Sequence, residues 1–198
     1  SKRDDEFAIG GKKNVTRDIY ELKIERSVEV LTDLIVDILG LCEVENISVL
    51  IDLNNSYKGR DYKIIHFDSP DVRGIDNALL YDQNKFSVLV SKAIENKLGG
   101  DDKTRDILYV KGSFLNVTLH IFVNHWPSNY GGKERAIPKR KLTAELLMNQ
   151  IKTIQKNDKF AEIILIGDFN EDPNDDNVKL LEKLGFINQM TPMMGERG

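Results

Sequence analysis

The segment from Phe114 to His125 constrains the fold most, because apolar residues occupy every second position along it. On an extended backbone, successive side chains point to opposite faces, so these residues share one face. The residues on this face are Leu115, Val117, Leu119, Ile121, Val123 and His125. His120 falls on the other face. The pattern predicts a long β-strand that is buried on one face and ends at a histidine.

Patterns elsewhere predict helices and strands on both sides of this segment. Apolar residues at near-helical spacing predict a long helix capped by Thr16 and further helices at 46–54, 142–154 and 175–184. Short apolar runs predict strands at 38–43, 62–67, 75–81, 85–90, 107–110 and 163–166. Hairpin-like strands between terminal helix–strand units predict an α/β (α+β) fold, in which helices flank a mixed sheet or a pair of sheets.

Length and composition limit the class of protein. The 198 residues are 40% hydrophobic and 30% charged, which predicts one soluble domain spanning residues 1–198. The single cysteine, Cys42, cannot form an internal disulfide, and no apolar run reaches the roughly 18 residues of a membrane helix. Cytoplasmic and exported locations both fit, because any signal peptide would precede residue 1.

The net charge of −4 argues against purely electrostatic binding of nucleic acid, unless a divalent metal supplies positive charge locally.

Four short stretches place polar residues directly after apolar runs. They are LCEVEN at 41–46, RGIDNALLYD at 73–82, VNHWPSN at 123–129 and IILIGDFNEDP at 163–173. In α/β folds, groups at the ends of strands are well placed to converge on one crevice. We therefore look for the chemistry of this chain in these stretches.

Two of the stretches place an ionisable side chain at the end of a strand. Glu43 closes the strand that begins near Asp37, and a carboxylate there suits Mg²⁺, which takes one or two carboxylates and keeps several waters. His125 ends the alternating strand, where an imidazole can donate a proton to a leaving oxygen near neutral pH. A solvated carboxylate and a half-buried structural histidine are the competing interpretations.

The GDFN tetrapeptide at 167–170 follows four apolar residues. On an extended backbone, the side chains of Asp168 and Asn170 point the same way. A carboxylate beside an amide suits the orientation of a water, because the carboxylate accepts its proton and the amide fixes a phosphate or the nucleophile. A calcium loop does not fit, because Pro173 stands where that loop needs glycine and Lys179 where it needs glutamate.

Basic residues are concentrated between Gly131 and Phe160, where eight Lys and Arg against three Asp and Glu give a net charge of +5. Such a run is typical of a solvated helix face, but it directly follows His125, where a phosphate backbone could pass. Arg73 and Arg105 precede predicted strands and can reach a phosphate from the strand ends. A surface ion pair is the alternative for each arginine.

Several other chemistries lack their motifs. The sequence contains no GxxxxGK[ST], GxGxxG or GxSxG pattern. One cysteine and three scattered histidines argue against a zinc site.

In this order, LCEVEN, RGIDNALLYD, NHWPSN and IGDFNEDP resemble the motifs of the endonuclease/exonuclease/phosphatase superfamily, which includes the pancreatic-type deoxyribonucleases. The likeness extends from about Asp4 to Pro173. The TRDILYV stretch at 104–110 is similar to bacterial members of that superfamily. The resemblance implies a four-layered sandwich of two packed mixed β-sheets flanked by helices. It also implies Mg²⁺-dependent hydrolysis of phosphoester bonds, with Mn²⁺ or Ca²⁺ as alternative cations.

The resemblance also assigns roles to individual residues. Glu43 matches the metal-ligand glutamate, and His125 matches the histidine that assists the leaving oxygen. Asp168 and Asn170 match the pair that orients the water and the scissile phosphate. Asp76 stands near the place of a carboxylate behind that histidine. Arg105 matches a strand arginine near the phosphate. Beyond the resemblance, Arg73 and Asn124 are also predicted to bind the substrate phosphate.

Two departures from the family pattern stand out. Nothing before Glu43 matches the family's asparagine-containing first strand, and nothing after Pro173 matches its final aspartate strand and Asp-His pair. Asn129 also replaces an arginine that is usual after Trp-Pro-Ser in the bacterial members. We therefore expect a domain that is incomplete at both ends and belongs to a longer enzyme.

The function predicted from the sequence is metal-dependent cleavage of phosphodiester bonds by water attack, as in a nuclease. A phosphatase or phospholipase-C-type enzyme acting on inositol phosphates or phospholipids is the alternative. A non-catalytic binding module on the same scaffold is the alternative from another class. The expected partner is nucleic acid or a small phosphorylated substrate, and the sequence indicates no obligate protein partner.

Overall fold

The computed structural model describes residues 10–100 and 102–193. Within these residues, no helix is both long and apolar enough to cross a membrane. In chain order the elements are α1 (Arg17–Leu34), β1 (Ile38–Val44), α2 (Ile47–Ser56), β2 (Tyr62–His66), β3 (Asp76–Asp82), β4 (Phe86–Ile94), β5 (Ile107–Phe114), β6 (Val117–His125), α3 (Lys133–Asn157), β7 (Glu162–Asp168), α4 (Asp176–Glu182) and the 3₁₀ helix η1 (Thr191–Met193).

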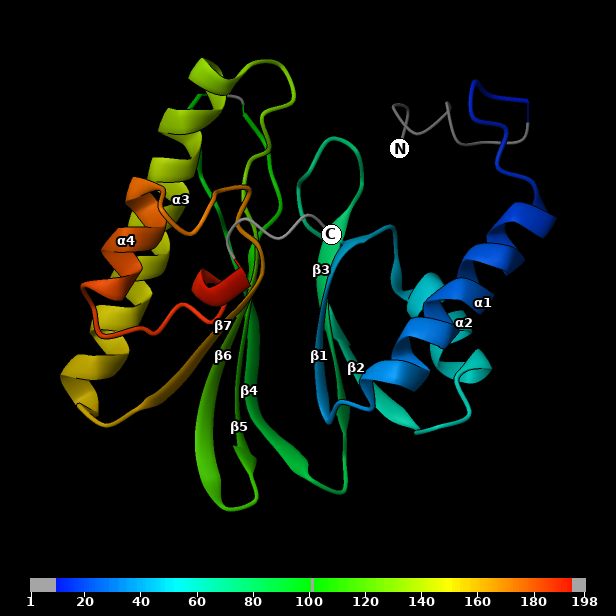
Figure 1. The fold of residues 1–198 in the computed structure, drawn as a ribbon, viewed down its shortest axis with the longest axis horizontal. Helices are drawn as coiled ribbons and strands as arrows, with labels where there is room; N and C mark the ends of the chain where they lie inside the picture. Colours follow the sequence, from blue (N-terminus) through cyan, green and yellow to red (C-terminus); the bar gives the residue numbers. More distant parts are fainter. Residues whose placement is uncertain (1–9, 101, 194–198) are drawn as a thin grey trace.

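The elements form four layers in the order helices, sheet, sheet, helices (Figure 1). The smaller sheet has the strand order β1-β3-β2 and is antiparallel, with α1 and α2 on its outer face (Figure 1). The larger sheet has the order β4-β5-β6-β7 and is mixed, because β6 is antiparallel to β5 and parallel to β7. α3 and α4 cover the outer face of the larger sheet. The predicted α+β sandwich is confirmed.

Strand β6 lies at the centre of the packing and is buried on both faces. The cluster between the two sheets contains Leu79, Phe86, Leu108, Val110, Ile121 and Val123. On the opposite face of β6, Phe122 packs into a second cluster with residues of α3 and α4, such as Leu147 and Leu181. The sequence predicted one buried face, and the helix layer buries the other.

The long strand predicted from Phe114 to His125 is interrupted by a tight turn. Leu115 and Asn116 have φ angles of +48° and +72°, so β5 continues to Phe114 and β6 begins at Val117. Two successive positive φ angles are typical of the turns that join hairpin strands. Leu115 is 65% exposed, so the apolar alternation continues through a residue that is not part of the core. For this reason the pattern alone could not locate the turn.

Helix α3 begins at Lys133, well before the start predicted at Leu142, and Pro138 lies inside it. A proline at this position removes one backbone hydrogen bond, the one that would reach the carbonyl of Glu134. The buried face of the helix nevertheless continues on both sides of the proline. Its buried residues are Ala136, Arg140, Thr143, Ala144, Leu147 and Ile151. Packing against the sheet stabilises the first turns in spite of the missing hydrogen bond.

The polar strand ends of both sheets lie at a common edge. The parallel register pairs His125 of β6 with Asp168 of β7, and Asn124 with Gly167. In the smaller sheet, Val44 at the end of β1 pairs with Asp76 at the start of β3. This edge therefore carries residues from all four polar stretches of the sequence.

Replacing Gly167 should strongly destabilise the fold. Its φ is +119°, and an added Cβ would lie 2.0 Å from the carbonyl oxygen of Asn124. We expect Gly167→Ala to lower the free energy of unfolding by about 3 kcal/mol or more, measured by urea denaturation. Gly131 is the matched control, because its φ is +89° but an added Cβ would meet no atom within 4 Å. Gly131→Ala should cost only about 1–2 kcal/mol, and equal effects would show that close packing at Gly167 is unimportant.

Candidate functional site

Glu43 is presented by a β-bulge at the end of β1. The pairing of β1 with β3 shifts register between Leu41 and Val44, and Glu43 has a φ of +61°. A bulge re-aims the side chain that it carries, and a positive φ in a residue other than glycine is a strained conformation that is often found at functional sites. The side chain of Glu43 is 64% exposed. Its carboxylate is therefore available to a ligand.

His125 lies between two carboxylates at this edge. Its Nε2 atom is 4.0 Å from Oε1 of Glu43 and 4.0 Å from Oδ2 of Asp168. The side chain is only 3% exposed, and within the described part of the chain its buried Nδ1 atom has no hydrogen-bond partner. The ring thus presents one nitrogen to the two carboxylates and keeps the other inside the protein.

Burial lowers the pKa of His125 to about 4, and the positive charge of Arg105 adds to this effect. The negative charges of Asp168 and Glu43 act in the opposite direction, but they do not overcome the burial. The imidazole is therefore neutral at pH 7. The negative charges of the two carboxylates, each 4.0 Å from Nε2, favour a proton on that nitrogen over the buried Nδ1, so we assign the single ring proton to Nε2.

The GDFN tetrapeptide forms a tight turn that is fastened to the segment after His125. The Asn170 backbone N–H donates to Oδ1 of Asp168 at 2.8 Å, and Asn170 has a φ of +50°. Its amide Nδ2 donates to the carbonyl oxygen of Trp126 at 2.9 Å. The Trp126 backbone N–H in turn donates to the carbonyl oxygen of Asp168 at 2.8 Å. These bonds hold Asp168 and Asn170 beside His125.

Arg73 approaches the same site from the loop between β2 and β3. Its Nη1 lies 3.9 Å from Oε1 of Glu43, and its side chain is 43% exposed. The Asp71 carboxylate fixes the loop by accepting the Arg73 backbone N–H at 2.8 Å. The guanidinium keeps exposed donors, so the contact of Arg73 with a phosphate stays a prediction that its position permits.

Two residues assigned to phosphate binding are buried and already bonded within the protein. Asn124 is fully buried, and its amide bonds Phe122, Ile166 and Trp126. Arg105 is 5% exposed, donating to Asp71 at 3.1 Å and to the Trp126 carbonyl at 2.8 Å. Burial lowers the pKa of Arg105, although Asp71 opposes this effect. Neither side chain reaches the open site, unlike Arg73.

Asp76, predicted to stand behind His125, is bonded to a different histidine. Its carboxylate accepts from Nε2 of His66 at 2.9 Å and from the Ser69 backbone N–H at 2.8 Å. Ala78, on the same face of β3 as Asp76, packs in the cluster beneath α1 and α2. That face looks away from the inter-sheet space in which His125 lies. The predicted contact with His125 is therefore absent from the described residues.

The pairing of His66 with Asp76 is a feature that the sequence analysis missed. Together with Asp68 they form a group whose candidate metal-ligand atoms all lie within 4.8 Å of one another. Asp68 is 94% exposed, whereas His66 and Asp76 are each 5% exposed. No local sequence signal identifies this group, since it depends on the pairing of β2 with β3.

The donors at Glu43 and Asp168 fit a hard divalent cation. Both are carboxylates, and their side chains are 64% and 57% exposed. Oxygen donors with room for bound water suit Mg²⁺, and also Mn²⁺ or Ca²⁺. The chemistry of these donors is compatible with a magnesium ion held by Glu43 and with Asp168 close to that ion, and the magnesium site at Glu43 stays a prediction.

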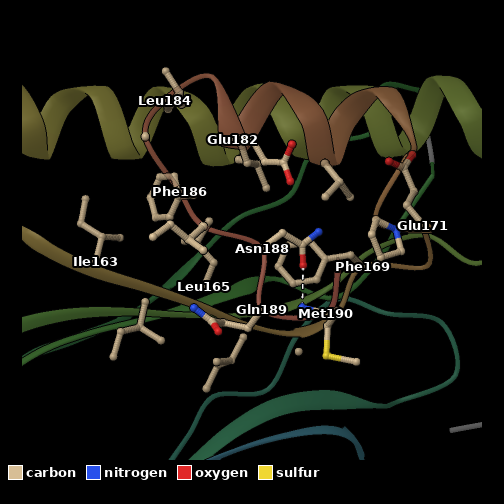
Figure 2. Close-up of a pocket in the computed structure, with 18 of the residues that line it drawn as sticks. Ile163, Leu165, Phe169, Glu171, Glu182, Leu184, Phe186, Asn188, Gln189 and Met190 are labelled. Carbon is tan, nitrogen blue, oxygen red and sulfur yellow. Dashed lines mark hydrogen bonds between the residues drawn. The ribbon is translucent and has the colours of Figure 1, made fainter. Parts of the chain in front are cut away.

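An apolar groove of about 1260 Å³ runs along β7, and Asp168 is one of the residues that line it. It is bounded by β7, α4 and the segment that leads to η1. Figure 2 shows Ile163, Leu165 and Phe186 on its walls, together with a hydrogen bond between Asn188 and Met190. The groove is thus continuous with the edge of the sheet that carries the polar site.

Comparisons with known proteins place these observations in a family. A model described as the endonuclease/exonuclease/phosphatase family matches residues 1–192. A search of the curated proteins found no significant match.

Solved structures resemble the fold at low sequence identity. Truncated TDP2 from Caenorhabditis elegans aligns with a TM-score of 0.63 and 20% identity, over 79% of this chain and 57% of that one. The mannosyl-6-phosphatase of Bacteroides thetaiotaomicron aligns with 0.62 and 17%, over 84% and 63%. ANGEL2, a 2′,3′-cyclic phosphatase, aligns with 0.63 and 16%, over 87% and 53%. The chain thus spans less than two thirds of each of these proteins, and the likeness shows the fold.

The buried neutral state of His125 should make stability depend on pH. Its pKa is lowered to about 4 in the folded protein and is about 6.5 when unfolded, so the unfolded chain binds a proton more readily. Stability should therefore fall as pH drops from about 6.5 towards 4, by up to about 3 kcal/mol from this group. Urea denaturation at several pH values, with EDTA present, should show that the free energy of unfolding falls less steeply below pH 6.5 in His125→Gln than in the wild type. Identical slopes would show that His125 is not held neutral.

Proposed function

Because the chain belongs to the endonuclease/exonuclease/phosphatase family, we propose that it is a metal-dependent hydrolase that cleaves phosphodiester bonds by water attack. The observation that carries this proposal is the convergence of Glu43, Arg73, His125 and Asp168, whose charged or polar ends lie within 4.0 Å of a neighbour in the group. A cation-binding carboxylate, a cationic donor, an imidazole and a second carboxylate are the groups that phosphoester hydrolysis requires.

Asp168 and Asn170 act on the attacking water. The exposed Asp168 carboxylate orients the water and accepts its proton. Asn170 uses one amide hydrogen to hold the Trp126 carbonyl and keeps its second hydrogen and its Oδ1 atom for water or phosphate. The pair therefore fixes the direction of attack.

His125 acts on the leaving oxygen. Because the imidazole is neutral at pH 7, it donates a hydrogen bond from Nε2 to the negative charge that develops there, rather than bringing a full positive charge. Arg73 supplies the positive charge by contacting a non-bridging phosphate oxygen. Mg²⁺ held by Glu43 would neutralise further charge on the phosphate and the leaving oxygen.

The surface beside the site favours an extended polyanion as the substrate. Lys133, Arg135 and Lys141 are exposed on the first turns of α3, directly after the loop that follows His125. A nucleic-acid backbone that leaves the site in this direction would meet these positive charges. This observation supports a nuclease over an enzyme for small phosphorylated substrates.

Nicking of supercoiled plasmid tests the proposal. We expect nicking with Mg²⁺, none with EDTA, and a loss of about 10²-fold or more in His125→Ala, because the leaving oxygen loses its hydrogen-bond donor. His120→Ala is the matched control, since His120 lies on the same strand and bonds Tyr109 away from the site. It should keep activity within a few-fold of the wild type.

Two results would count against this assignment. Nicking by His125→Ala at the wild-type rate would remove the proposed role of the histidine. A folded protein that binds Mg²⁺ but leaves plasmid intact would exclude a DNA endonuclease and shift the substrate to small phosphate esters, which p-nitrophenyl phosphate would report.

A further inference from the structure

Two buried guanidinium groups hold consecutive backbone carbonyls directly after His125. Nη2 of Arg105 donates to the Trp126 carbonyl at 2.8 Å, and Nη1 of Arg140 donates to the Pro127 carbonyl at 3.1 Å. Arg105 is 5% exposed and Arg140 is 3% exposed. The segment Trp126–Pro127, which directly follows β6, thus accepts a hydrogen bond from each of two buried guanidinium groups.

Each arginine is paired with a buried carboxylate from a different loop. Nη1 of Arg105 lies 3.1 Å from Oδ2 of Asp71, whose side chain is 3% exposed. Nε of Arg140 lies 3.0 Å from Oε1 of Glu171, whose side chain is 5% exposed. A buried ion pair repays its desolvation only when the geometry is good and further hydrogen bonds are made, so these pairs permit few alternative arrangements.

The two loops carry the other groups of the site. Asp71 also accepts the backbone N–H of Arg73, the residue that faces Glu43. Glu171 directly follows Asn170 and accepts a further hydrogen bond from Asn177 in α4 at 2.6 Å. The two ion pairs therefore connect the loop between β2 and β3, the end of β6 and the turn after β7.

We propose that Arg105–Asp71 and Arg140–Glu171 form a brace that sets the separation of Glu43, His125 and Asp168, and that neither arginine contacts the substrate. The inference deepens the proposed function, because the groups that it positions are those assigned to hydrolysis. It gives Arg105 a positioning role in place of the phosphate contact expected from the sequence. Because Arg140 is buried in its ion pair with Glu171, it does not belong to the exposed positive charges of α3 that the proposed function assigns to substrate contact.

The Trp126 amide provides a readout that does not depend on activity. Its N–H donates to the Asp168 carbonyl across the site at 2.8 Å. Arg140 also donates to Oδ1 of Asn129 at 2.9 Å, so its three bonds come from two different nitrogen atoms of the guanidinium. A lysine carries all its donors on one atom and lacks this planar fork. In Arg140→Lys, hydrogen exchange at Trp126 should be about ten-fold faster or more, while the Ile121 amide in the middle of β6 exchanges at the wild-type rate.

A matched control lies one residue away on the same helix. Lys139 forms an ion pair with Asp102 at 2.9 Å, in which the side chains are 34% and 53% exposed. Lys139→Gln removes one positive charge from α3 but leaves the brace intact. It should leave the exchange at Trp126 and kcat unchanged, because any effect of the lost charge on nucleic-acid binding would change KM instead.

Kinetics then link the brace to the reaction. With plasmid and Mg²⁺, Arg140→Lys should lower kcat about ten-fold and leave KM within about three-fold, because misplaced groups impair the transition state more than binding. If Arg140→Lys does not fold, Glu171→Gln takes its place, because glutamine keeps an oxygen acceptor for Arg140. The same two measurements apply to it, namely hydrogen exchange at Trp126 and the kinetic constants.

The outcomes separate the brace from the proposed function. Unchanged exchange and unchanged kcat in a folded variant would overturn the brace. Equal acceleration at Trp126 and Ile121 would also overturn it, because that result describes general destabilisation. Selective acceleration at Trp126 in a protein without hydrolytic activity would support the brace and contradict the proposed function.

Discussion

The site depends on the parallel pairing of β6 with β7. This register sets His125 opposite Asp168, and it requires the backbone at Gly167 to pass so close to Asn124 that no side chain fits between them. A shift of one residue would send His125 to the opposite face of the sheet. The bulge at the end of β1 then turns Glu43 towards the same point from the other sheet. Packing of the two sheets is thus what assembles the site.

Charge is distributed unequally within this site. The exposed carboxylates of Glu43 and Asp168 flank an imidazole that burial keeps neutral. Buried charges of the described residues around the site form ion pairs instead, as in Arg105–Asp71 and Arg140–Glu171. In the proposed function the exposed groups are the ones that contact substrate, water and cation, while the buried ion pairs fix the backbone that carries them.

Part of this site can be predicted from the sequence because polar groups at the ends of strands converge on one edge of the fold. Glu43, His125 and Asp168 each follow an apolar run, and the ends of such runs meet at one edge of the sandwich. The roles of Arg105 and Arg140 could not be predicted in this way, because their carboxylate partners lie 34 and 31 residues away in the chain. The same applies to Asp76, whose partner depends on which face of β3 it occupies. Local patterns predict strands and their ends, but long-range pairing decides which polar group is buried.

A calorimetric Mg²⁺ titration tests the central claim, a cation site at Glu43, most directly. We expect the wild type to bind Mg²⁺ and Glu43→Gln to weaken binding about ten-fold or more, because the amide removes the ligand's charge. Asp68→Asn, which alters the group with His66 and Asp76, should leave binding unchanged. Loss of Mg²⁺ binding in Asp68→Asn but not in Glu43→Gln would contradict the account. So would a folded wild type without Mg²⁺ binding, which would favour a non-catalytic binding scaffold.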